Sequence, residues 1–166
     1  MLEALNRGID EVRMHIEQTI RTLNRLIRVC RDSEDFCGAA ARRAVAADLG
    51  AVLRHRSDEF GRLGDELQAL VLLLGGEPVT SATLAARARH FGFGARLAVL
   101  GPDDATIVTA WQSVEREAET RYLAAIDGYL PERIRRTVSL QADRVVGRAE
   151  RIASLCDEVA MGSPSH

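Results

Sequence analysis

The chain lacks several features that define common classes of protein. Lysine is absent, so all 22 basic residues are arginine, a bias to which we attach no functional meaning. Aromatic residues make up only 4% of the chain and runs of β-branched residues are missing, which disfavours a β-sheet and favours helix. The three cysteines do not have the spacing of a disulfide scaffold, which is typical of a reducing compartment.

Charge and hydropathy exclude further classes. The longest run of large apolar residues is Leu70 to Leu74, which is too short to span a membrane. The net charge of −2 differs from the basic balance of a general nucleic-acid binder, so we expect neither a nucleic-acid nor a membrane partner. The first residues are charged and contain no apolar signal core. This predicts a cytoplasmic location. The sequence leaves open whether translation starts at Met1 or at Met14.

The residues that are present form a helical pattern with clear breaks. Apolar residues recur every three or four positions, and the breaks predict long helices at roughly 12–46, 48–74, 103–129 and 131–159. The first two are joined by a short turn, so they must be antiparallel neighbours. A long crossover with a short extra helix near 82–98 follows the second. This order predicts an all-α fold, a ferritin-like four-helix bundle over residues 14–160.

The two ends of the chain follow different patterns. An apolar stripe near the N-terminus is interrupted by Gly8, and we expect residues 1–13 to form an N-terminal arm. Such an arm would pack on a neighbouring molecule or on the outside of the fold, so a homo-oligomer is the expected state. Residues 161–166 are expected to be a disordered tail. The N-terminal stripe consists of Leu2, Leu5, Ile9 and Val12.

Two glutamates occupy positions where helical stripes should be apolar. Glu34 lies in a stripe of the first long helix whose other members are apolar or small. Glu115 interrupts a stripe of the third long helix in the same way. Buried carboxylates are costly unless they are paired, hydrogen-bonded or bound to a metal. We therefore expect both glutamates to face the centre of the bundle.

Three groups of residues stand out by their order and spacing: Leu23-Asn24-Arg25-Leu26-Ile27 with Arg31-Asp32-Ser33-Glu34-Asp35-Phe36, Glu66-Leu67-Gln68-Ala69-Leu70-Val71 with Leu74-Gly75-Gly76-Glu77-Pro78, and Glu115-Arg116-Glu117-Ala118 with Tyr122. Together they resemble a bacterial ferritin-like family of unknown function. The resemblance covers most of the chain, roughly residues 20–155. It implies a four-helix bundle of the ferritin-like kind, and it implies no established activity.

A di-metal centre of this kind needs single carboxylates from two helices and a Glu-x-x-His pair from each of the other two. Glu34 and Glu115 match the two single-carboxylate positions. Glu-x-x-His occurs nowhere in the chain, and the residue three positions after Glu59 is Arg62. The four histidines lie on unrelated elements. The predicted ligand set is therefore incomplete.

The polar residues on the other two stripes suggest a core without metal. We predict a network in which Arg56 and Arg148 oppose the two glutamates, because a guanidinium matches a carboxylate in geometry and keeps its proton. In the alternative, both arginines extend to solvent and the glutamates bond locally. The predicted network comprises Glu34, Arg56, Glu59, Glu115, Tyr122, Gln141 and Arg148.

The function predicted from these residues is not catalytic. The protein would be a ferritin-like bundle with a degenerate di-metal site and no cofactor, and it would serve a structural, stress-related or interaction role. The alternative is a di-iron or di-manganese carboxylate protein with ferroxidase or oxidase activity. In that case Glu34, Glu59 and Glu115 would bind the iron or manganese.

Overall fold

The computed structural model describes residues 1–79 and 104–153. Within these ranges every regular element is a helix, so the predicted all-α class is confirmed there. The described helices are α1 (Leu2–Ala41), α2 (Ala47–Leu73), α4 (Asp104–Asp127) and α5 (Glu132–Val145). The expected crossover helix near 82–98, the end of the last helix near 159 and the expected tail at 161–166 lie outside the described residues.

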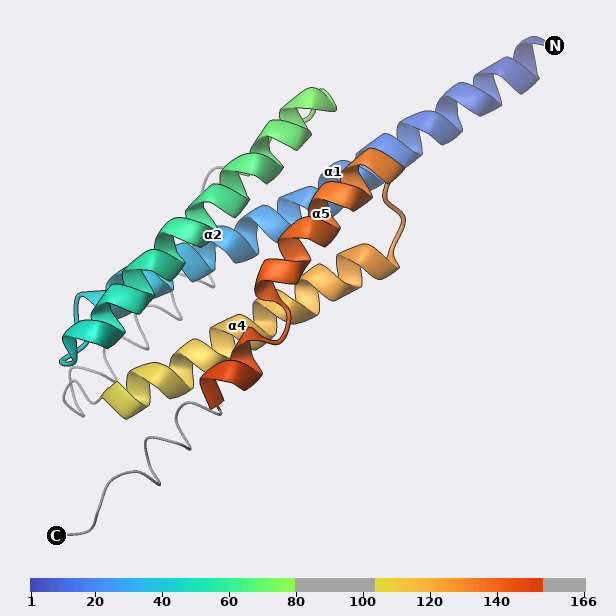
Figure 1. The fold of residues 1–166 in the computed structure, drawn as a ribbon. Helices are drawn as coiled ribbons and strands as arrows, with labels where there is room; N and C mark the ends of the chain where they lie inside the picture. The colour runs from blue at the N-terminus through green and yellow to red at the C-terminus, as the bar shows by residue number, and fades with distance from the viewer. Residues whose placement is uncertain (80–103, 154–166) are drawn as a thin grey trace, which may run out of the picture.

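The four helices lie lengthwise beside one another (Figure 1). α2 returns antiparallel to α1, α4 runs in the same direction as α2, and α5 returns antiparallel to α4. The end of α2 and the start of α4 lie at opposite ends of the described fold, and most of the predicted crossover between them lies outside the described residues. Side chains of all four helices join in one apolar core.

The start and the end of α1 differ from the prediction. The helix begins at Leu2 and passes through Gly8 without a break, so the N-terminal arm continues into the first core helix. It ends at Ala41 and not near residue 46, because the chain turns there toward α2. In this turn the backbone amides of Val45 and Ala46 donate to the carboxylate of Asp104 at 2.8 and 2.9 Å. This contact attaches the first residue of α4 to the α1–α2 connection.

The predicted last helix is broken. α5 ends at Val145, and Gly147 adopts a positive φ of 71°, a conformation that side chains with a Cβ avoid. The Gly147 amide donates to Oε2 of Glu119 on α4 at 3.3 Å, and residues 148–153 are helical again. Arg148 therefore follows the break and does not continue the helix of α5.

The core follows the three-and-four spacing of each helix. Polar side chains are buried among the apolar ones near the middle of the fold, and Arg56, Glu115 and Gln141 are all almost fully buried. None of the described helices is long and apolar enough to cross a membrane. Fully buried core residues include Leu23 and Ile27 of α1, Leu53 and Leu63 of α2, Ile107 and Tyr122 of α4, and Val138 and Val145 of α5.

Candidate functional site

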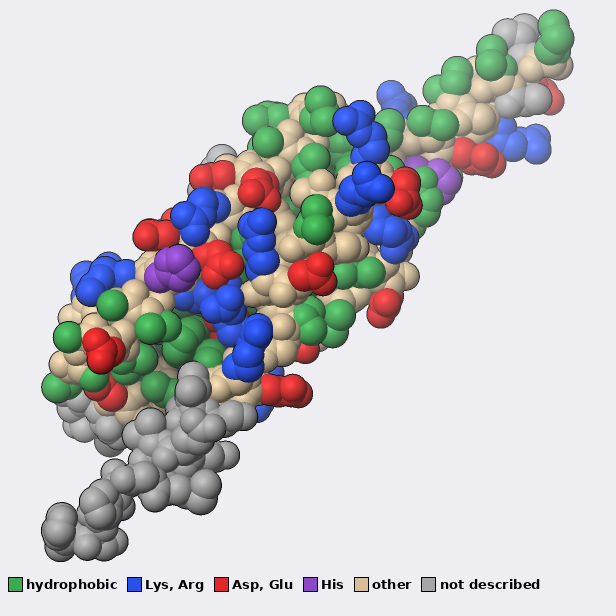
Figure 2. Space-filling view, viewed as in Figure 1, with side chains coloured by type: hydrophobic (Ala, Val, Ile, Leu, Met, Phe, Trp, Pro, Cys, Tyr) green, Lys and Arg blue, Asp and Glu red, His purple; other side chains and the backbone are tan. Residues whose placement is uncertain are grey.

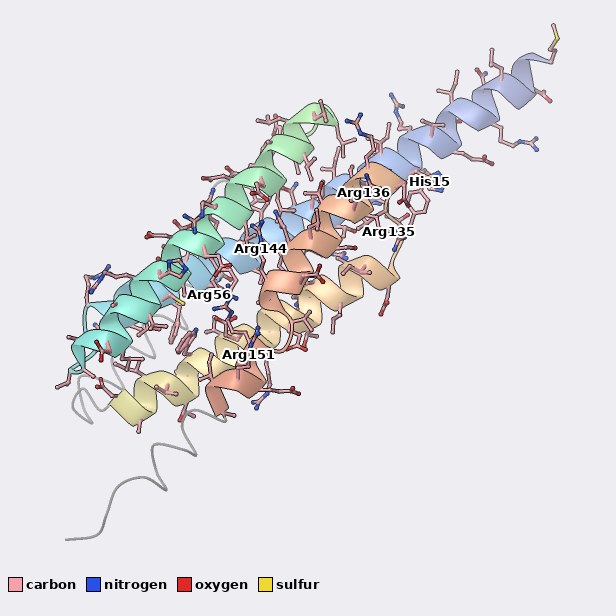
Figure 3. All side chains as sticks on the ribbon, viewed as in Figure 1. His15, Arg56, Arg135, Arg136, Arg144 and Arg151 are labelled. Atoms are coloured by element: carbon pink, nitrogen blue, oxygen red, sulfur yellow. The ribbon has the colours of Figure 1, made fainter. Side chains whose placement is uncertain are left out.

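A buried ion pair joins α2 to α4 near the middle of both helices. The Nε and Nη2 groups of Arg56 donate to Oε1 and Oε2 of Glu115 at 2.8 and 2.6 Å. Arg56 is 1% exposed and Glu115 is 0% exposed. Figure 3 shows Arg56 in the space between α2 and α4. A two-point contact of this kind uses both carboxylate oxygens and is stronger than hydrogen bonds between neutral groups.

Three neighbouring side chains hold the pair in place. The Nη1 group of Arg56 donates to Oε2 of Glu59, one turn along α2, at 2.7 Å. The guanidinium lies over the ring of Phe60, with 4.1 Å between Cζ and the ring centroid. The indole N–H of Trp111 donates to Oε1 of Glu115 at 2.8 Å. All three guanidinium nitrogens and both oxygens of Glu115 therefore have partners, which makes the burial of these charges tolerable.

The charges of Arg56 and Glu59 are fixed at neutral pH. Burial would lower the pKa of Arg56, but its bonds to Glu115 and Glu59 outweigh burial and raise the pKa above its usual value. Burial would raise the pKa of Glu59, but the hydrogen bond and charge of Arg56 hold it below its usual range. A general acid or base works best with a pKa near the operating pH. The pKa values of Arg56 and Glu59 are both shifted away from neutral pH.

Arg148 lies at the rim of the cluster. Its Nη2 is 3.6 Å from Oε2 of Glu59, and its side chain is 30% exposed. Burial, followed by the positive charge of Arg56, lowers the pKa of Arg148, and its Nε is buried with no hydrogen-bond partner among the described residues. Arg148 thus faces Glu59 and not the two glutamates predicted for it. The break at Gly147 explains the difference, because it takes Arg148 off the stripe of α5.

A second buried chain of hydrogen bonds begins two turns further along α4. The side-chain amide of Gln141 donates to Oε2 of Glu66 at 2.8 Å, so its Oε1 is left to accept from the Tyr122 hydroxyl, also at 2.8 Å. A hydroxyl has one proton to donate. The Tyr122 oxygen therefore accepts from the Cys30 thiol, 3.3 Å away. The chain connects α1, α2, α4 and α5.

Burial keeps the Cys30 thiol and the Tyr122 hydroxyl protonated at neutral pH. It raises the pKa of the Cys30 thiol to about 12. Burial also raises the pKa of Tyr122 well above its usual value, and Cys30 adds to that shift. A reactive cysteine needs a lowered pKa. Cys30 is therefore a structural thiol and not a nucleophile.

The predicted inward position of Glu34 is wrong. Its side chain is 35% exposed and belongs to neither cluster; Oε2 accepts from Nη1 of Arg31 at 2.8 Å. The carboxylate lies over Gly61 at the α1–α2 seam, so close that a Cβ added to Gly61 would stand 2.9 Å from Oε1. Arg31 also reaches Asp65 of α2 at 2.5 Å. Glu34 lies at the edge of the buried face of α1, where its carboxylate has Arg31 as a partner and remains accessible to water.

The residues of the central cluster do not fit a di-metal centre. The guanidinium of Arg56 faces both oxygens of Glu115 and one of Glu59, and so occupies the position that a cation would need. A divalent cation placed beside it would be repelled. Glu34, the third predicted ligand, lies at a different seam. Within residues 1–79 and 104–153, no three His, Cys, Asp or Glu side chains are grouped to hold a metal ion.

Two members of the central cluster were not predicted. Trp111 precedes Glu115 by four residues and Phe60 follows Arg56 by four, so each lies one helical turn from its partner. That spacing was a usable signal, because a buried indole N–H needs an acceptor and an arginine favours an aromatic face. By periodicity alone, both residues count only as apolar members of their stripes.

The fold and the site together define an all-helical protein with a buried arginine–carboxylate cluster between its helices. Residues 18–128 match the family described as Domain of unknown function (DUF2383), and the chain belongs to this family. The matched range includes Arg56, Glu59 and Glu115 of the cluster but ends before α5. The predicted resemblance to an uncharacterised family is confirmed to that extent. No curated protein matches the chain.

Proposed function

We propose that the protein is a non-catalytic helical bundle of the ferritin-like kind, in which a buried arginine supplies the positive charge that metal ions would supply in a di-metal relative. The protein would then act in a structural or interaction role, as a homo-oligomer. The observation that carries the proposal is the contact of the Arg56 guanidinium with Glu115 and Glu59.

The direction of the helices supports the ferritin-like part of the proposal. A ferritin-like bundle has one long crossover, which makes its second and third long helices run in the same direction. α2 and α4 do so here (Figure 1). Carboxylates of these two helices meet in the interior, which is where bundles of this kind build their metal sites.

The non-catalytic part rests on charge and protonation. The cluster contains a guanidinium that cannot lose its proton under ordinary conditions, and its carboxylates are engaged by that guanidinium. Tyr122 and Cys30 are held protonated by burial. None of these five groups offers a free base, a free nucleophile or an open ligand position.

The test is metal analysis of the full-length protein. Native protein is incubated with Fe²⁺ under nitrogen, or with Mn²⁺, then desalted, and the metal per chain is measured by elemental mass spectrometry. We expect far less than one equivalent. Two variants are measured in parallel: Glu115→Gln, which changes the central carboxylate, and Glu117→Gln, which changes an exposed glutamate of the same helix.

The two variants make the outcome specific. Two equivalents of metal retained by the native protein and by the Glu117→Gln variant, but lost in Glu115→Gln, would overturn the proposal in favour of a di-metal protein. Oxygen consumption during Fe²⁺ loading, measured on the same samples, would then show ferroxidase activity.

A further inference from the structure

The N-terminal arm carries an uncovered apolar stripe. Leu5, Ile9 and Val12 are 62%, 57% and 59% exposed, and Ile16 at the base of the arm is 37% exposed. Figure 2 shows the arm extending beyond the rest of the molecule, with hydrophobic side chains along it. The helix is continuous through this stretch, so the stripe is presented on a regular scaffold.

The stripe is the uncovered part of a seam that the fold buries further along. Its steps of four and three continue from Ile16 into α1, where each position is at most 1% exposed. This spacing is that of the a and d positions of a coiled coil. A seam buried in one half and bare in the other indicates that something covers the bare half. The buried continuation consists of Thr19, Leu23, Leu26 and Cys30.

We propose that a second copy of this chain covers the stripe, and that the two N-terminal arms pack antiparallel across a twofold axis. The spacing is self-complementary in this orientation: one register places Ile9 opposite the partner's Val12 and Leu5 opposite the partner's Ile16. The inference rests on the interaction role proposed above and does not depend on the polar cluster of the core.

The end of the bundle from which the arm emerges supplies apolar contact area that two short arms lack. A pair of helices shorter than two heptads is marginal by itself. In the antiparallel register, the tip of each arm reaches the end of the partner molecule from which the partner's arm emerges. Tyr129 stacks on His15 at that end and remains 46% exposed, and Leu72 and Leu73 at the end of α2 are also exposed. Gly76 contacts Ile20, which places the end of α2 at the same level.

The polar face of the arm favours a protein over a membrane as the partner. A helix that lies on an anionic membrane is rich in Lys and Arg opposite its apolar side. Residues 1–13 carry acidic and basic side chains in nearly equal number. A mixed face suits a protein surface, and twofold homodimers are the commonest assemblies of soluble chains. The charged residues of the arm are Glu3, Arg7, Asp10, Glu11 and Arg13.

The first test measures mass in solution. Full-length native protein is examined by size exclusion with light scattering, together with Val12→Asp and the matched control Leu140→Asp. Val12 and Leu140 are both 59% exposed, but Leu140 lies on α5 and not on the arm. We expect native and Leu140→Asp to be dimers. A dimer of Val12→Asp contains two aspartates in its interface. Each aspartate is expected to raise the dissociation constant of the dimer about tenfold, so the two together raise it about 100-fold.

The second test measures orientation. Spin labels are placed at Glu3→Cys or Glu11→Cys in a Cys156→Ser background, and distances between the two copies are measured by pulsed electron resonance. In the proposed register the two labels at position 11 lie nearly opposite each other. The two labels at position 3 are separated by roughly 20 Å more along the helix axis, at 1.5 Å per residue.

Three outcomes would overturn the inference. A monomeric native protein would do so, as would equal distances at positions 3 and 11, which would mean parallel arms. Binding of monomer to vesicles of phosphatidylcholine and phosphatidylglycerol, lost in Val12→Asp but kept in Leu140→Asp, would assign the stripe to a membrane surface. None of these results changes the metal content on which the proposal for the core is tested.

Discussion

Breaking the Arg56–Glu115 pair should be costly, and removing both partners should be much less so. The variants are Arg56→Met, Glu115→Leu and the double variant. Removing one partner of a buried ion pair typically costs about 3–5 kcal/mol, because the other charge stays buried without compensation. Arg56→Met leaves Glu115 with only the Trp111 indole as a donor, so we expect a loss near the upper end. Glu115→Leu leaves Arg56 with Glu59, so we expect a loss near the lower end.

The double variant has a different cost. Apolar residues replace both charges, and such replacements are often neutral or stabilising. The Trp111 N–H loses its acceptor, which costs about 1–3 kcal/mol, and Glu59 keeps only the more distant Arg148. We expect a total loss of about 2–4 kcal/mol, where additivity would give about 6–10. The resulting coupling energy between Arg56 and Glu115 is at least about 2 kcal/mol.

Urea unfolding measures these values directly. Circular dichroism follows the helices, and Trp111, the single tryptophan, reports on the site by fluorescence. The control is the exposed pair of Glu117 and Arg121, whose 2.8 Å contact resembles the buried one in distance only. Exposed pairs of this spacing couple by about 0.3–0.5 kcal/mol. A coupling between Arg56 and Glu115 no larger than this control would refute the reasoning.

Three further predictions concern pH and the backbone. Burial raises the pKa of Cys30 and Cys37 to about 12, whereas an unfolded thiol titrates near about 8.5. The folded state therefore holds more protons above that pH, and the free energy of unfolding should fall by about 1.4 kcal/mol per pH unit for each thiol between pH 9 and 10. Cys37→Ala should halve this slope in urea titrations. The pKa of Glu59 is lowered, so its contribution is present above its unfolded pKa of about 4.3 and lost as pH falls below that value. Glu59→Gln should flatten the acid limb of stability against pH, and an unchanged limb would contradict the assignment. Gly147→Ala should cost about 1–2 kcal/mol because of its positive φ, and Gly147→Asn should cost less; equal stability of all three proteins would show that the break in α5 is absent.

Periodicity was enough to predict the described helices apart from their ends and the break at Gly147, and it placed Arg56 and Glu115 in the core. The stripes of α2 and α4 include Arg56 and Glu115, and both side chains are buried in the structure. The reason is physical: a residue in the middle of an apolar stripe has no route to water on a packed helix. The same reasoning applies to Tyr122 and Gln141, whose hydroxyl and amide meet in the core.

Periodicity fails at the edges of a stripe and at breaks in the backbone. Glu34 stands at an edge, and whether it turns inward depends on the facing helix, where Gly61 leaves room beside it. The partner of Glu34 is Arg31 of the same helix and not one of the two arginines predicted in the core. Arg148 was misplaced because one residue, Gly147, interrupts the helix that carries it. The first error depends on the facing helix, which a pattern within one segment does not contain, and the second depends on a glycine that a stripe of apolar residues does not register.

The most direct test of the central claim is a crystal structure with anomalous diffraction data collected at the iron and manganese edges from metal-soaked crystals. We predict that the Arg56 guanidinium lies between Glu59 and Glu115 and that no anomalous peak lies within coordination distance of those carboxylates. A pair of peaks bridged by Glu115, with the guanidinium displaced, would contradict the account.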